Sequence, residues 1–154
     1  MSLLDVFQIS SQGMTAQRTR LEVASSNLAN SNTTRTAEGG PYRRRDVVLE
    51  SAPVDNAAST FGSSFDNAWT DAPEQQIQQG VRSTTMVSQA NTGIKRYQPD
   101  HPDADASGYV TMPDVDPLEE TVNMMSAARA FEANATAFNT AKEMVRASLK
   151  LGDA

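Results

Sequence analysis

The sequence predicts a mainly α protein with a small β part: two long terminal helices forming a coiled-coil-like pair, with a small β-rich insert between them. Large apolar residues recur every seven positions near both ends of the 154-residue chain. This spacing is typical of a helix that buries a narrow stripe against another helix. The segment between the ends lacks the repeat and contains turn residues and short strand-like runs. We therefore expect a discontinuous helical assembly domain at 1–33 and 116–154, and an insert at 34–115.

The repeat itself defines the expected assembly interface, which we call the seam. In the first helix the seam residues are Phe7, Met14, Leu21 and Leu28. In the last helix they are Met124, Phe131, Phe138 and Val145. Small or polar residues (Ser10, Gln17, Ala24) follow three positions after the first-helix seam, so a partner helix is able to approach closely. The role expected of all eight seam residues is packing, not chemistry.

Helix-capping and helix-terminating residues set the expected ends of both helices. The first helix should run from about residue 3 to about residue 29, because asparagines and hydroxyl side chains then compete for the backbone. Asp116 is a suitable N-cap for the last helix, Pro117 fits its first position, and Glu119 completes a capping-box-like pair. This helix should continue to about Leu151 and stop at Gly152.

Four short strands are expected in the insert, at residues 42–49, 81–87, 94–97 and 109–112. The stretch 52–79 is rich in Ala, Ser, Asn, Asp, Gln and Pro. It is expected to be flexible or a loop with one short helix, since Phe61, Phe65 and Trp69 are spaced four apart.

Composition excludes several classes of function. The net charge of −6 argues against a general nucleic-acid binder, and the absence of cysteine excludes disulfides and thiolate metal sites. No apolar run approaches the roughly 20 residues that span a bilayer, so no direct membrane insertion is expected. The first ten residues are a poor secretory signal, which predicts a cytoplasmic protein or export without a cleaved signal peptide.

Several segments, in order along the chain, resemble one bacterial family. Residues 21–36 (LEVASSNLANSNTTRT) are similar to the amino-terminal signature of flagellar axial proteins of the rod and hook. Residues 38–44, 101–105, 108–110, 112–113, 115–117 and 126–134 narrow the resemblance to the C-type proximal-rod family of the flagellar basal body. The similarity runs from end to end and is weakest at 52–79.

The resemblance implies a structural subunit of the periplasmic rod, the drive shaft for motility, and not an enzyme. It implies polymerisation through the terminal helices, with copies of itself and other rod proteins as partners. It also implies export through the flagellar type III apparatus without a cleaved signal peptide. Neither a cofactor nor a catalytic or metal-binding residue is expected.

Three local features have competing interpretations. Asp103, Asp105 and Asp114 fall at positions of a calcium-loop pattern, but Pro102 and Pro113 bracket it, which favours a solvated turn. His101 is the only histidine and has no motif partner for catalysis, so an exposed turn histidine is favoured. The run 43–45 (RRR) either contacts an anionic surface of a neighbouring subunit or is solvated.

Alternative functions come from other classes. A soluble coiled-coil adaptor, or a related type III secreted structural protein, would share the seam pattern. The segments at 27–34 and 38–44 favour the rod over both. A calcium-dependent binding module would depend on 103–114 alone, and an enzyme is the least favoured reading.

Overall fold

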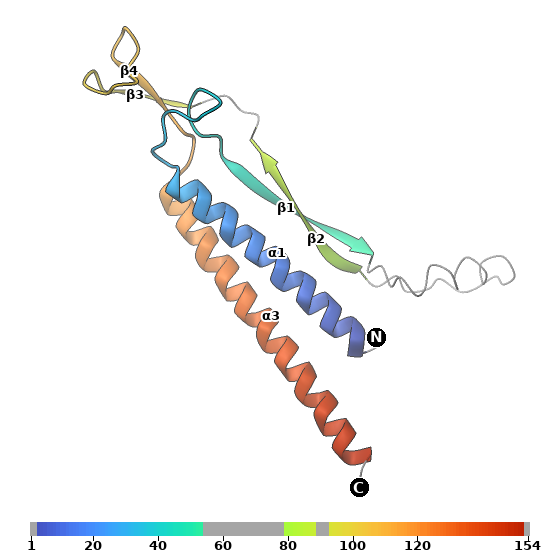
Figure 1. The fold of residues 1–154 in the computed structure, drawn as a ribbon. Helices are drawn as coiled ribbons and strands as arrows, with labels where there is room; N and C mark the ends of the chain where they lie inside the picture. The colour runs from blue at the N-terminus through green and yellow to red at the C-terminus, as the bar shows by residue number, and fades with distance from the viewer. Residues whose placement is uncertain (1–2, 54–78, 89–92, 153–154) are drawn as a thin grey trace, which may run out of the picture.

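The computed structural model describes residues 3–53, 79–88 and 93–152. The elements are helix α1 (Leu3–Ala29), strands β1 (Arg45–Pro53), β2 (Gln79–Val87), β3 (Ile94–Tyr97) and β4 (Tyr109–Met112), and helix α3 (Pro117–Gly152). The two terminal helices dominate the molecule, and the strands form two separate two-stranded antiparallel sheets (Figure 1). The expected mainly α fold with a small β part is therefore confirmed.

Helices α1 and α3 lie side by side and run in opposite directions (Figure 1). The ring of Phe7 meets the ring of Phe138 edge to face, with centroids 4.9 Å apart. Six residues further along α1, Gly13 lies against the side chain of Asn134, where even a Cβ atom would come within 2.9 Å of the amide nitrogen. Alanines account for most of the buried apolar residues of the two helices, which allows the backbones to approach closely.

The β1–β2 ribbon covers a second side of α1. Arg45 lies opposite Val87 at one end of this ribbon, and Pro53 lies opposite Gln79 at the other. Both strands contact α1, whereas α3 contacts neither of them. Helix α1 therefore lies between the ribbon and α3, and among the described elements α3 is covered by α1 alone (Figure 1).

The β3–β4 ribbon lies at the end of the molecule where α1 ends and α3 begins (Figure 1). Tyr97 and Tyr109 pack edge to face across it, with ring centroids 5.3 Å apart. Val110 on β4 and Val115 just before α3 are buried, and they anchor this end of the insert.

The bounds of the helices and of the last two strands agree with the sequence-based expectation. The first strand does not: it runs from Arg45 to Pro53, not from residue 42 to residue 49. The side chain of Asn27 binds the hydroxyl of Tyr42 and the N–H of Arg45, and the ladder starts only at Arg45. Strand β2 begins two residues earlier than expected, at Gln79. The expected short helix around 61–69 lies outside the described residues.

The start of α3 corrects a second expectation. Asp116 caps the helix as predicted, since its Oδ1 accepts a hydrogen bond from the backbone N–H of Leu118 at 2.9 Å. Glu119 does not complete a capping box. Its carboxylate turns instead toward Arg44 and accepts hydrogen bonds of 2.9 and 3.3 Å from the guanidinium group.

Candidate assembly site

A polar junction joins the helix pair to the insert, and Asn27 is at its centre. The side chain of Asn27 is 1% exposed and lies near the carboxyl end of α1. Its Oδ1 accepts hydrogen bonds from the N–H of Arg45 and the hydroxyl of Tyr42, both at 3.0 Å. Its Nδ2 donates to the carbonyl of Arg45 at 2.8 Å. One amide side chain thus satisfies both backbone groups of the residue that starts β1.

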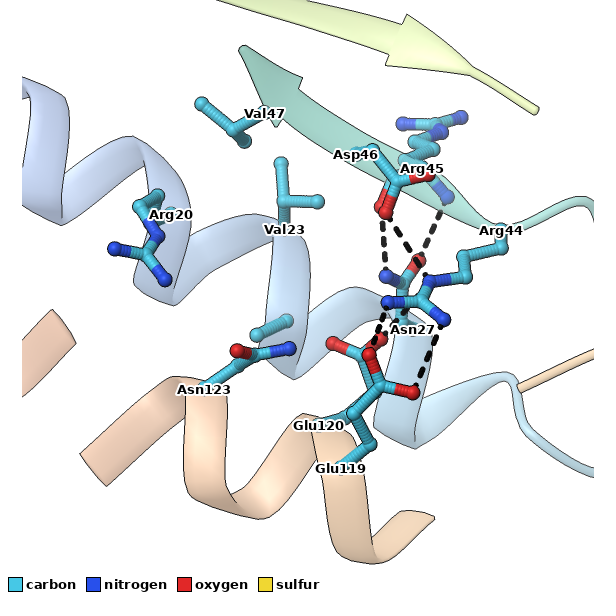
Figure 2. Close-up of a pocket in the computed structure, with 11 residues that line it drawn as sticks. Arg20, Val23, Asn27, Arg44, Arg45, Asp46, Val47, Glu119, Glu120 and Asn123 are labelled. Carbon is cyan, nitrogen blue, oxygen red and sulfur yellow. Dashed lines mark hydrogen bonds and ion pairs between the residues drawn. The ribbon is translucent and has the colours of Figure 1, made fainter. Parts of the chain in front are cut away.

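Arg44 connects the insert to the other helix (Figure 2). Its guanidinium donates to Asp46 at 3.1 Å and, through two nitrogens, to the carboxylate of Glu119. The hydrogen bonds to Glu119 are the main reason that the pKa of Arg44 is raised above its ordinary value. The same bonds hold the pKa of Glu119 below the ordinary 4.5. Both groups are therefore charged over the whole neutral range.

Glu120 is a buried acid in the same junction. The residue is 2% exposed, and its Oε1 lies 3.2 Å from Nε of Arg44 without hydrogen-bond geometry. A carboxylate removed from water needs a counter-charge, and the guanidinium of Arg44 supplies it. Arg44 is therefore placed by the acids of α3, and the start of β1 is fixed relative to both helices.

These residues surround a polar hollow of about 260 Å³ between α1, β1 and the first turns of α3 (Figure 2). Val23 and Val47 line one side of it, and mainly charged and amide side chains line the rest. The arrangement fixes α1, β1 and the first turns of α3 relative to one another. We call this junction the polar joint.

The seam residues are divided between contacts within the chain and partial exposure. Phe7 and Phe138 contact each other directly. Phe131 keeps 39% of its surface exposed, whereas the others are half-buried: Met14, Leu21, Leu28, Met124 and Val145. None of the eight seam side chains is fully buried.

The buried row of α3 lies beside the predicted seam and was missed by the sequence analysis. It consists of four residues spaced seven apart: Glu120, Ala127, Asn134 and Ala141. Three of these four are buried, and Asn134 lies against Gly13. The signal was present as a second seven-residue repeat, three positions after the seam. Its small and polar members concealed it from a search for large apolar residues.

The loop features have local structural roles. Asp105 accepts backbone hydrogen bonds from Ser107 and Tyr109, which lowers the pKa of its carboxyl group. Asp103 accepts a hydrogen bond from the hydroxyl of Thr34, which connects this loop to the segment that follows α1. Nδ1 of His101 accepts the N–H of Asp103 at 3.1 Å. Within the described part of the chain, no three His, Cys, Asp or Glu side chains gather as a potential metal site.

The three residues of the arginine run, expected either to contact a neighbouring subunit or to be solvated, have different environments. Arg44 is paired within the chain, while Arg43 and Arg45 are exposed.

Among the helices described, none is long and apolar enough to cross a bilayer.

The fold and its joint define a structural protein with two long helices and a side insert, and comparison with known proteins identifies the family. Residues 7–35 match the family described as "Flagella basal body rod protein", and residues 106–151 match "Flagellar basal body rod FlgEFG protein C-terminal". The chain is 39% identical to the flagellar basal-body rod protein FlgC of Borreliella burgdorferi, covering 98% of both chains. It is 38% identical to FlgC of Escherichia coli and 36% identical to FlgC of Bacillus subtilis, covering 99% of each chain in both cases.

The chain therefore belongs to the FlgC family of flagellar basal-body rod proteins. It is a structural subunit of the rod and not an enzyme, and it assembles with other basal-body components. The resemblance found in the sequence is confirmed.

Proposed function

We propose that this chain polymerises through its two terminal helices to form part of the proximal rod. In this proposal residues 1–33 and 116–154 act as one assembly domain, and residues 34–115 form an insert beside it. The helices pair as in a coiled coil within each subunit, and the outer surface of that pair meets neighbouring subunits. Copies of this chain and other rod proteins are the partners.

The observation that carries the proposal is the apolar surface left open on α3. Six of the large apolar residues that remain exposed belong to this helix: Leu118, Val122, Met125, Phe131, Met144 and Leu149. A helix of a soluble monomer normally presents polar residues away from its core. Exposed apolar residues along a helix that is covered on one side favour burial against another subunit.

The proposal extends to location and export. A rod subunit of this kind lies in the periplasm and reaches it through the flagellar type III apparatus. A chain without cysteine is suited to unfolded export, because no disulfide forms on the way. The polar joint then fixes the insert relative to the helices once the chain has refolded at the growing end.

The test is Phe131→Asp, scored in a strain that lacks this protein. Phe131 lies at the edge of the α1–α3 contact, so we expect a new carboxylate there to be trapped between subunits at a cost of several kcal/mol. Complemented cells should then lack complete rods in electron micrographs and should not swim. Secretion of the variant is measured separately, so that an export failure is recognised.

Thr84→Asp is the matched control. It adds the same charge at an exposed position of β2, outside the helix pair, and should leave swimming unchanged. Normal rods and normal swimming with Phe131→Asp would show that the helix pair is not the assembly contact.

A further inference from the structure

Helix α3 is longer than the helix that covers it. The antiparallel pair is fixed by the contact between Phe7 and Phe138. Only four residues of α1 precede Phe7, whereas α3 continues for 14 residues past Phe138. About ten residues of α3 therefore extend beyond the described end of α1, a distance of ~15 Å. Figure 1 shows this extension as the red end of α3.

The extension continues the apolar face that α3 turns toward α1. Val145 follows Phe138 by seven residues, and Leu149 follows Val145 by four, so both lie on the same side of the helix. Leu149 is 66% exposed. Val145 is half-buried, so the face that packs on α1 elsewhere is covered only in part at this end, and Leu149 is its exposed member.

A complementary apolar stripe lies at the other end of the same helix. Leu118, Val122 and Met125 are spaced four and three apart, and all are more than half exposed. At 100° per residue this stripe lies roughly opposite the buried row that contains Glu120 and Ala127. It therefore faces away from α1 in the first turns of α3.

The charges around the two surfaces are opposite. Residues 114–125 contain four acids and no base; Asp114, Asp116 and Glu119 are exposed, and Glu119 is already paired with Arg44. Residues 142–150 contain three bases and one acid, and the bases Lys142, Arg146 and Lys150 are exposed. Within the described residues these three bases form no ion pair.

We propose that the carboxyl-terminal extension of α3 docks on the Leu118–Val122–Met125 stripe of a second copy of this chain. This inference rests on the proposed function and specifies one of its contacts. Val145 and Leu149 of one copy pack between the stripe residues of the next, and Arg146 approaches Asp114 and Asp116 of that copy. The contact joins two different surfaces, so it continues from copy to copy and does not form a two-fold dimer.

The contact is small, which has a consequence for where it forms. Two or three large side chains from each copy bury far less than the roughly 1,000 Å² of a stable interface. Copies in dilute solution should therefore stay apart. In the rod, other contacts hold the copies together and raise the effective concentration of the two surfaces.

The absence of cysteine allows a disulfide test in assembled basal bodies. The double variant Met125→Cys, Leu149→Cys is expressed in a strain lacking this protein, and basal bodies are isolated and oxidised. The two positions are 24 residues apart on one helix, ~36 Å, so no disulfide forms between them within one chain. We expect a ladder of disulfide-linked multimers that collapses on reduction. The control pair Met125→Cys, Ala137→Cys should give at least tenfold less product, because Ala137 lies ~18 Å from Leu149 along the helix.

Equal products from both pairs, no ladder in assembled basal bodies, or cross-linking to a different rod protein would each overturn the proposal. If the double cysteine variant does not assemble, a charge-reversal experiment tests the same contact. Arg146→Glu should reduce the number of complete rods, and Asp114→Arg in the same chain should restore it; absence of rescue would also overturn the proposal. Failure of these tests while Phe131→Asp still blocks assembly leaves polymerisation through the helices intact, whereas normal assembly of Phe131→Asp refutes polymerisation itself.

Discussion

Replacing Arg44 by methionine should destabilise the chain far more than the same change at Arg45. In the Arg44→Met variant the buried carboxylate of Glu120 loses its counter-charge, since that carboxylate is 3% exposed and has Arg44 as its only ion-pair partner among the described residues. Removing one member of a buried pair costs ~3–5 kcal/mol. Arg44 keeps 26% of its side chain in water, so we take the lower end, about 3 kcal/mol. The loss of the exposed Glu119 contact adds little.

The assay is urea unfolding of the purified chain, followed by circular dichroism at the helix band. A loss of about 3 kcal/mol lowers the folding equilibrium constant roughly 150-fold. On heating it corresponds to a midpoint lower by about 6–12 °C for a chain of this size. Arg45→Met removes a neighbouring arginine whose side chain is exposed, and its backbone bonds to Asn27 remain. It should change stability by less than about 0.5 kcal/mol.

A compensating variant sharpens the test. Arg44→Met combined with Glu120→Met replaces both charges by apolar side chains, which is often neutral for a buried pair. The double variant should therefore recover most of the stability lost by Arg44→Met. Equal effects of Arg44→Met and Arg45→Met, or no recovery in the double variant, would falsify the buried-pair account.

Two further predictions concern the same region and the loop beyond it. Asn27→Ala should lower the free energy of unfolding by about 2 kcal/mol, because the N–H and C=O of Arg45 lose their partner, while Ser25→Ala at an exposed position of α1 should be neutral in the same assay. Stability should also fall in acid: the pKa values of Glu119 and Asp105 are depressed in the folded state, so their contribution is complete above the ordinary values of 4.5 and 3.8 and is lost as the pH falls through the depressed values. Asp105→Asn should flatten this acid dependence in a pH series of urea unfolding curves; an unchanged dependence would contradict the role given to Asp105.

The ends of the helices were predictable from sequence because they are set by residues at the ends themselves. Asp116 and Pro117 start α3, and Asn30 ends α1 by donating from its side chain to the carbonyl of Ser26. The strand start at Arg45 was not predictable. It depends on Asn27, 18 residues away, and a hydrogen bond across that separation leaves no periodic pattern in the sequence.

The seam shows a different limit of sequence reasoning. A seven-residue repeat of large apolar residues identifies the face of the helix, but the centre of a close helix contact is occupied by small residues. Ala16, Ala24, Ala127 and Ala141 are the fully covered ones, and Phe131 covers only the edge. A search for large apolar residues therefore misses the buried small residues of α3.

The small buried row and the polar joint together explain why such a chain is suited to assembly. Alanine side chains contribute little burial energy compared with Leu or Phe, so the helix pair gains modest stability from its own contact. The buried polar groups of Glu120 and Asn27 are matched to particular partners at the joint, which fixes the insert relative to the helices. Large apolar side chains of α3 instead lie exposed at the edge of the helix contact and on the outer face of the helix. Burial energy that a monomeric protein would place in its core thus remains available for contacts between subunits.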